Sequence, residues 1–208
     1  MEHKIIVVGI GPGSPDYILP IASAAITQAK VLVGSQRALD AFAPENITTK
    51  VIGKDIKGVL TFIDKSLATH DVVVMVSGDP GFHSLLAALK ARFSQSQIAV
   101  IPGISSMQLA FARMSEVWQD AQLISMHGRQ ANEKDLEYKL NKKLGILTDH
   151  EHNPSHIAQV LLNRGWPVDS QVWLGEGLSY KTEQCKVLTL GETVQISDFN
   201  HCVMVVKA

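Results

Sequence analysis

Short apolar runs alternate with longer amphipathic stretches through the first half of the chain. Four runs are continuously apolar, which is expected of strands buried on both faces. These runs are Ile5–Ile10, Val31–Gly34, Val72–Ser77 and Ile98–Ile101. The apolar spacing predicts helices over Ile18–Ala29, Gln36–Ala41, Ile56–Leu67, Ser84–Phe93 and Ser105–Met114. This alternation is typical of a mostly parallel sheet covered by helices.

The pattern changes after a polar connector at Ser115–Asp120, which carries Trp118. Beyond it, closely spaced strands separated by turns at Gly175–Gly177 and Gly191 predict a mixed sheet. The predicted strands are Gln122–Ser125, Gly145–Thr148, Gln171–Leu174, Cys185–Leu190 and Cys202–Val206, and the predicted helices are Glu133–Lys142 and Pro154–Arg164. We therefore predict two α/β domains, residues 1–115 and 121–208, with the active site in the cleft between them.

Composition narrows the class of partner. The 208 residues are 46% hydrophobic and 19% charged, with a formal net charge of −1. Such a balance gives no long-range field to collect nucleic acid or anionic lipid, so neither is an expected partner. Cys185 and Cys202 are too few for a disulfide framework and lack metal-ligand spacing. Without a signal peptide or an apolar run of ~20 residues, the expected location is the cytoplasm.

The first of three glycine-rich loops follows the first apolar run, at Gly9-Ile10-Gly11-Pro12-Gly13-Ser14. A dinucleotide fingerprint needs a third glycine where Ser14 stands and an acidic residue about 20 positions further on, which is missing. Pro12 also removes a backbone donor. A phosphate-binding P-loop would need Gly-Lys-Ser/Thr, which is absent. The remaining alternatives are a tight strand-to-helix turn or a different ligand.

The other two loops follow the third and fourth apolar runs. In Ser77–Ser84, glycines flank Asp79, whose carboxylate is as well suited to a ribose or ammonium group as to capping the next helix. In Ile101–Ser106, the two serines either cap a helix or place its free N–H groups beside a carboxylate. Each loop alone favours an ordinary structural role at least as much as a ligand site.

Two histidine-containing segments lie in the second half. Met126-His127-Gly128-Arg129 follows a predicted strand, where a histidine at the cleft is a candidate for catalysis as well as for a structural role. Thr148–His152 contains histidines and carboxylates, but it lacks the spacing of a His-Glu-x-x-His site. The segment is typical of residues that precede a helix. We expect no metal site.

The order of these motifs resembles the tetrapyrrole (precorrin/corrin) methylase family over nearly the whole chain. The family's Gly-x-Gly-Pro-Gly, Gly-Asp-Pro and Pro-Gly-Ile/Val-Ser/Thr turns are matched by Gly9–Gly13, Gly78–Pro80 and Pro102–Ser105. The branch that methylates C-5 of precorrin-7 or its cobalt form is similar over longer segments. These are Ile101–Arg113, Ser125–Arg129, Leu147–Asp149, Asn153–Ala158 and Gly175–Tyr180 with Glu183.

The resemblance implies S-adenosylmethionine as the methyl donor. The residues that the family pattern places around it are Pro12, Ser77, Gly78, Asp79, Phe82, Ser105, Ser106, His127 and Leu178. Many family members have Asp where this chain has Ser14, and Asp16 does not inherit any duty of that acid.

The implied reaction moves a methyl group from a sulfonium to an electron-rich ring carbon. The leaving group needs no acid, so the protein's task is to align the reactants and exclude water. His127 is the candidate base for any proton lost by the macrocycle. The substrate's carboxylates need cations, and the candidates are Arg37, Arg113, Arg129 and Lys181. For each of the four, a solvated surface charge is an equally good interpretation.

The resemblance also implies partners. Related aerobic enzymes commonly carry a second, decarboxylating methyltransferase domain, and here one activity fills the length. We therefore expect the cobalt-first, anaerobic version, with a separate C-15 methyltransferase/decarboxylase, and a homodimer as is common in the family. Two alternatives stay open: a diphthine synthase, which the His127-Gly128-Arg129 block argues against, and a non-catalytic nucleotide-binding module.

Overall fold

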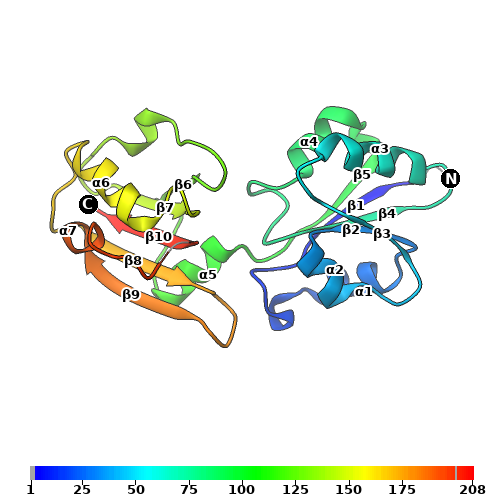
Figure 1. Cartoon of the computed structure of the whole chain (residues 1–208), viewed down its shortest axis with the longest axis horizontal. Helices are drawn as coiled ribbons and strands as arrows, with labels where there is room; N and C mark the ends of the chain where they lie inside the picture. Colours follow the sequence, from blue (N-terminus) through cyan, green and yellow to red (C-terminus); the bar gives the residue numbers. More distant parts are fainter. Residues whose placement is uncertain (1–2, 200) are drawn as a thin grey trace. The chain divides into compact units, whose positions relative to one another are not determined.

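A computed structural model describes residues 3–199 and 201–208. The chain divides into two compact units, Met1–Ser105 and Ser106–Ala208, each with its own five-stranded sheet (Figure 1). We predicted the division after the helix Ser106–Arg113 (α5), but it falls before it. The reason is packing, because α5 contacts β7 (Lys143–Leu147) and β10 (Cys202–Lys207) of the second unit.

The first unit is a parallel sheet with the strand order β3-β2-β4-β1-β5. Its strands are β1 (Ile5–Gly9), β2 (Val31–Gly34), β3 (Thr48–Val51), β4 (Val72–Val76) and β5 (Ile98–Ile101). Its helices are α1 (Pro20–Thr27), α2 (Gln36–Phe42), α3 (Ile56–Ser66) and α4 (Leu86–Arg92). The four predicted strands and the parallel pairing are confirmed.

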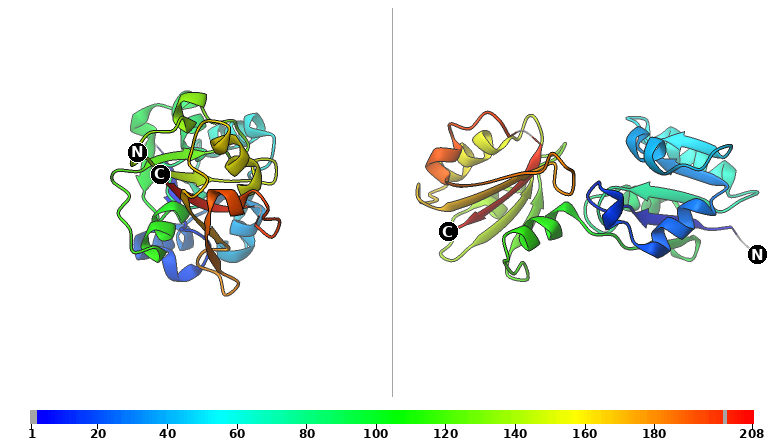
Figure 2. Two further views of the ribbon diagram at one scale, coloured as in Figure 1. Left: turned by 90° about the vertical axis from the view of Figure 1, so that its left-hand side faces the viewer. Right: turned by 90° about the horizontal axis from the view of Figure 1, so that it is seen from below.

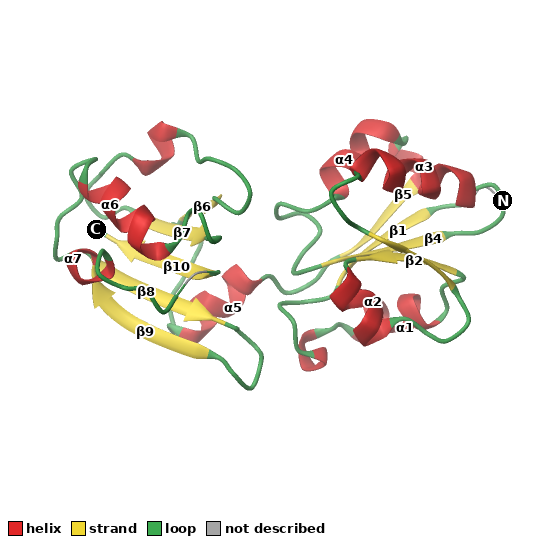
Figure 3. Cartoon of the chain, viewed as in Figure 1, coloured by secondary structure: helices red, strands yellow, loops and turns green. Residues whose placement is uncertain are grey.

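Alternation along the buried strands creates two cores, one on each face of this sheet. Val72 and Val74 of β4 face one core, with α3 and α4. Val73 and Met75 face the other core, with α1 and α2. Figure 3 shows these helix pairs on opposite faces of the sheet. Because such a strand is buried on both faces, none of its side chains faces water, which explains the continuous apolar runs.

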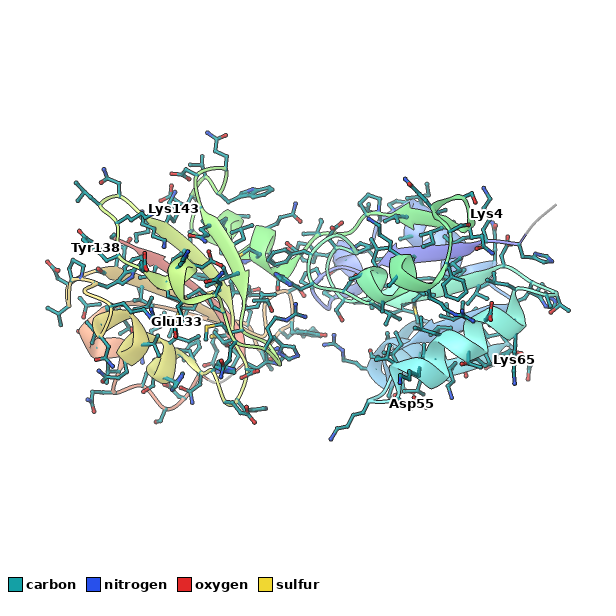
Figure 4. The ribbon with its side chains drawn as sticks, turned by 90° about the horizontal axis from the view of Figure 1, so that it is seen from above. Lys4, Asp55, Lys65, Glu133, Tyr138 and Lys143 are labelled. Carbon is teal, nitrogen blue, oxygen red and sulfur yellow. The ribbon has the colours of Figure 1, made fainter. Side chains whose placement is uncertain are left out.

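The edge strand β3 was not predicted from the sequence. It pairs with β2 alone, and three of its four residues are exposed, so it carries no apolar run. The next helix, α3, in contrast has signals in the sequence at both of its ends. Asp55 caps α3 by accepting a hydrogen bond from the backbone N–H of Gly58 (2.9 Å), and Lys65 lies in the last turn (Figure 4). The Asp55 side chain satisfies an unpaired N–H group at the start of the helix, and the Lys65 charge complements the helix dipole at its end.

The second unit contains the predicted mixed sheet, in the order β6-β7-β10-β8-β9. The remaining strands are β6 (Gln122–Ser125), β8 (Gln171–Glu176) and β9 (Gln184–Thr189), and the helices besides α5 are α6 (Pro154–Leu162) and α7 (Leu190–Thr193). Only β6 and β7 pair in parallel; the other described pairs of this sheet are antiparallel. Figure 2 shows this unit from two further sides.

Helices cover both faces of the mixed sheet. Leu144 and Ile146 of β7 lie in a core with Ile157 of α6. Gly145, between them in sequence, faces Met107 of α5: a Cβ at Gly145 would lie 2.6 Å from the Met107 sulfur. None of the helices within the described residues is long and apolar enough to cross a membrane.

Two local predictions in this unit are wrong, and a third is displaced by two residues. Only Glu133–Leu136 of the predicted helix Glu133–Lys142 is helical, as a 3₁₀ turn. The Lys142 ammonium donates to the carbonyl oxygens of Asp135 (2.7 Å) and Glu137 (2.8 Å), which replaces the backbone bonds of a longer helix. Gly175 lies inside β8, where its missing side chain leaves room for the Trp173 ring, so the turn predicted at Gly175–Gly177 begins only at Gly177. Gly191 lies inside α7.

Candidate functional site

Three glycine loops meet at the carboxyl end of the parallel sheet. They follow β1, β4 and β5, which are neighbours in the sheet. A Cβ added at Gly9 would lie 2.6 Å from the Gly103 nitrogen and 2.7 Å from the Gly78 oxygen, and a Cβ at Gly103 would also meet the Gly78 oxygen. Only glycine allows the three backbones to approach this closely. The motifs therefore build one backbone surface together.

The first loop is tied to the second by a two-way backbone bridge. Gly78 N–H donates to the Gly11 oxygen (2.8 Å), and Gly11 N–H donates to the Gly78 oxygen (3.4 Å). Both glycines have positive φ angles, 77° and 68°. Because the Gly11 amide is engaged, it cannot serve as a phosphate donor, as the failed dinucleotide fingerprint indicates. A 3₁₀ turn at Pro15–Tyr17 also separates this loop from α1.

Asp79 braces the second loop against the third. Its Oδ1 accepts a hydrogen bond from Gly81 N–H (2.8 Å) and its Oδ2 accepts one from Gly103 N–H (3.1 Å). The following helix, α4, begins at Leu86 and has no side-chain cap. The helix-capping alternative for Asp79 is therefore wrong. A contact with a ligand stays a prediction, and the half-buried carboxylate already determines the shape of both loops.

Other predicted residues surround the same edge. Arg37, in the first turn of α2, donates from Nη2 to Oγ of the exposed Ser77 (3.4 Å). Pro12 and Phe82 are half-buried, and Ser105 is buried. Ser106 instead begins α5 in the second unit. The three loops contain no Lys or Arg. Glycine backbone, hydroxyls and an aromatic ring fit an adenosyl group without phosphates better than a dinucleotide.

In the second unit, the His127-Gly128-Arg129 segment turns directly after β6. Met126 N–H donates to the Leu147 oxygen (2.9 Å), which continues the pairing of β6 with β7 to the residue before His127. Gly128 N–H then donates to Oδ2 of Asp149 (2.6 Å), and Arg129 N–H to the Met126 oxygen (3.4 Å). His127 and Arg129 are both exposed beyond the end of the sheet.

Asp149 organises this end of the sheet. Its Oδ1 accepts hydrogen bonds from the backbone N–H groups of His152 (2.6 Å) and Glu151 (2.9 Å), in addition to the Gly128 bond on Oδ2. These backbone donors hold the pKa of the Asp149 carboxyl well below its usual range. Within residues 3–199 and 201–208, no three His, Cys, Asp or Glu side chains are placed to hold a metal ion.

A second histidine packs against His127. The His201 and His127 rings are stacked, with centroids 4.8 Å apart and planes 18° apart. His201 precedes β10, and its backbone N–H donates to Oε1 of Glu176 at the end of β8 (3.3 Å). Partial burial, with the charges of His127 and His150, lowers the pKa of His201. Sequence reasoning missed His201, Glu176 and the role of Asp149, because only strand pairing brings them beside His127.

The remaining predicted residues are Leu178, Lys181 and Arg113. Leu178 is buried in the turn after β8, in contact range of Gly175, while Lys181 is exposed further along the same connection, before β9. Arg113 forms a two-pronged ion pair with Glu183, Nε with Oε1 and Nη2 with Oε2 (3.1 Å). Glu183 also accepts from Ser179 N–H (2.8 Å), and Arg113 holds its carboxyl pKa below the usual range. Arg113 thus already has a carboxylate partner within its own unit.

Comparison with known proteins decides the family. Residues 4–194 match the sequence profile of the Tetrapyrrole (Corrin/Porphyrin) Methylases. The chain belongs to the tetrapyrrole methylase family. This confirms the resemblance predicted from the glycine motifs.

Two relatives of this tetrapyrrole methylase have similar descriptions. A protein from Methanocaldococcus jannaschii described as a probable cobalt-precorrin-7 C(5)-methyltransferase is 31% identical over 211 residues, covering 97% of this chain and 96% of the relative. A cobalt-precorrin-7 C(5)-methyltransferase from Salmonella typhimurium is 34% identical over 181 residues, covering 86% and 87%.

Solved structures show the same two-domain fold. The uroporphyrin-III C-methyl transferase from Thermus thermophilus, complexed with S-adenosyl homocysteine, aligns with a TM-score of 0.76 at 20% identity. The alignment covers 98% of this chain and 91% of that one. At this identity the likeness concerns the fold alone.

Proposed function

We propose that this tetrapyrrole methylase transfers a methyl group from S-adenosylmethionine to C-5 of cobalt-precorrin-7 in cobalamin biosynthesis. One observation carries the proposal: two relatives with that description are 31% and 34% identical over most of both chains. The motifs that distinguish this branch support it, because His127-Gly128-Arg129 and Gly175–Tyr180 both lie at the same end of the mixed sheet.

The first unit is the proposed cofactor-binding part. S-adenosylmethionine, when bound, supplies a methyl group on a sulfonium whose leaving group departs as a neutral thioether. The residues that would hold it are Pro12, Ser77, Gly78, Asp79, Phe82 and Ser105 of this unit, with Ser106, His127 and Leu178 of the second unit. The fit rests on the cation-free glycine loops and on the engagement of the Gly11 amide, which both disfavour a phosphate-rich ligand.

The protein's contribution to the chemistry is positioning. Aligning sulfur, methyl and ring carbon and excluding water is worth up to ~7–11 kcal/mol. A proton that leaves the macrocycle needs an acceptor, and the exposed imidazole of His127 is the proposed one.

Cations of both units are proposed to bind the substrate's carboxylates. Arg37, Arg129 and Lys181 are exposed. An arginine fork meets a carboxylate with two hydrogen bonds, so the two arginines are the stronger anchors. We propose that Arg113 acts indirectly, since its ion pair with Glu183 supports the turn after Leu178.

The wider setting is part of the same proposal. The word cobalt in both relatives' names supports a substrate that already carries the metal, as in the anaerobic route. We propose a cytoplasmic homodimer that leaves methylation and decarboxylation at C-15 to a separate enzyme.

Two measurements test the proposed function. Calorimetric titration with S-adenosylhomocysteine, NAD and ATP should show binding of the first alone. Incubation with cobalt-precorrin-7 and labelled S-adenosylmethionine should then transfer one methyl group to the macrocycle. Binding of NAD or ATP without S-adenosylhomocysteine would favour the nucleotide-binding module, and cofactor binding without methyl transfer would contradict the substrate.

A further inference from the structure

His201 lies at the edge of the mixed sheet where the branch-specific motifs end. The carboxyl ends of β6, β7 and β8 and the start of β10 share this edge, because β10 runs antiparallel to β7 and β8. The edge brings together His127 after β6, Asp149 after β7, Glu176 at the end of β8 and His201 before β10. Three of these four residues have no role in the proposed reaction as described above.

The His127 ring has one aromatic neighbour at this edge among the described residues. The two imidazoles lie nearly parallel, 18° apart, with 4.8 Å between their centroids. This is the offset-stacking range for aromatic rings. A stacked ring restricts rotation about the last side-chain torsion of His127, which would otherwise be broad.

Both members of the stack are held from the backbone side. Asp149 anchors the turn that follows His127 through the Gly128 N–H (2.6 Å). Glu176 anchors His201 through its backbone N–H (3.3 Å), and Cys202, next in sequence, donates to Oγ1 of the buried Thr148 (2.8 Å). The stack therefore rests on three strand ends, while His127 itself is exposed.

We propose that His201 is a positioning residue that fixes the orientation of the His127 imidazole by stacking on it. The inference rests on the proposed function, in which His127 accepts a proton from the macrocycle. His201 does not itself exchange protons in this account. The lowered pKa of His201 agrees with an uncharged ring that serves as a flat surface at neutral pH.

The test compares two variants at His201. His201→Phe keeps a flat ring but removes both nitrogens, whereas His201→Ala removes the ring. His201→Ala should lower kcat about tenfold to a hundredfold, the range for a misaligned reacting group. His201→Phe should retain most of the activity. His150→Ala, an exposed histidine of the same edge that does not stack on His127, is the matched control and should keep the wild-type kcat.

A double-mutant cycle separates positioning from a general structural effect. In a His127→Ala background, His201→Ala should cause no further loss of kcat, because the residue through which it acts is gone. The His127 ring protons should also lose their ring-current shift in the NMR spectrum of His201→Ala. Circular dichroism and thermal unfolding of each variant show that the fold is retained.

Several results would overturn the inference. They are an unchanged kcat in His201→Ala, an equal loss in His201→Phe, or additive losses in the cycle. A wild-type enzyme that transfers no methyl group would instead overturn the proposed function, and with it the catalytic part of this inference. Wild-type activity beside an unaffected His201→Ala variant would overturn the inference alone.

Discussion

The two units present different kinds of surface at the ends of their sheets. In the first, three backbones meet at Gly9, Gly78 and Gly103, and a side chain is excluded. In the second, exposed or half-buried side chains gather: His127, Asp149 and His201. A backbone surface suits a cofactor that never changes, and a side-chain surface suits a substrate that differs from one family member to another. The comparison predicts that variants of the two units affect different ligands.

The largest effect is expected from Gly103→Ala in the first unit. The new methyl group would meet backbone atoms of Gly9 and Gly78, which cannot move aside without shifting β1 and β4. Overpacking of this kind costs about 3 kcal/mol of unfolding free energy. Gly53→Ala is the matched control, because nothing lies within 4 Å of its added Cβ. Urea unfolding of both variants measures the difference, and equal stability would mean that the loops are not in close contact.

A cation of the second unit should affect the macrocycle alone. Arg129→Ala should raise the KM for the macrocycle about ten- to hundredfold, equivalent to losing a hydrogen-bonded charge contact of about 1.5–3 kcal/mol. Its affinity for S-adenosylhomocysteine should stay the same, and Arg129→Lys should restore only part of the loss.

Arg113 provides the contrast within the same unit. Because it is paired with Glu183, Arg113→Ala should lower thermal stability as well as activity.

For Arg129→Ala, equal losses of affinity for the cofactor and for the macrocycle would contradict the prediction that the two units affect different ligands.

Asp79 should show the reverse selectivity. Asp79→Ala removes the acceptor for the Gly81 and Gly103 amides, so the second and third loops lose their connection. We expect about tenfold weaker binding of S-adenosylhomocysteine, or roughly 1.4 kcal/mol, with cooperative unfolding retained. Calorimetric titration measures this change. Unchanged affinity would leave Asp79 with a purely structural role.

The smallest effect concerns pH and lies at the opposite end of the mixed sheet, where β7 begins at Lys143 and β10 ends at Lys207. Hydrogen bonds from Lys207, the Val117 amide and Lys143 lower the pKa of Glu116 from 4.5 to about 2. Its folded-state pKa is below the unfolded value, so the stabilisation is complete above about pH 4.5 and is lost as the pH falls towards 2. In Glu116→Gln, the free energy of unfolding should depend less on pH between about pH 4.5 and 2. Urea unfolding at several pH values measures this dependence. Identical profiles for the variant and the wild type would contradict the assignment.

The same contrast explains what the sequence could predict. The strands and glycine loops of the first unit are encoded locally, in apolar runs and in motifs such as Gly78-Asp79-Pro80. The edge strand β3 was not predicted because three of its four residues are polar and three are exposed, so it carries no apolar run. Two local patterns of the second unit were misleading. Glu133–Lys142 has helical composition, but the Lys142 ammonium binds its carbonyl oxygens. Gly175 makes room for Trp173 inside β8, and the turn begins at Gly177.

The candidate site was also only partly predictable from the sequence. His127 stood out because a motif surrounds it, whereas His201 lies in no motif and reaches His127 only through the order β6-β7-β10. Arg113 was predicted as a substrate cation because the sequence does not show that Glu183, far along the chain, is its partner. Pairing between distant residues is the information that one sequence does not contain.

The most direct test of the account is the position of the transferred methyl group. The wild-type protein would be incubated with cobalt-precorrin-7 and S-adenosylmethionine carrying a ¹³C-labelled methyl group, and the product examined by ¹³C NMR. The account predicts a single labelled methyl group bonded to C-5. Label on a different carbon, or none on the macrocycle while S-adenosylhomocysteine binds normally, would contradict it.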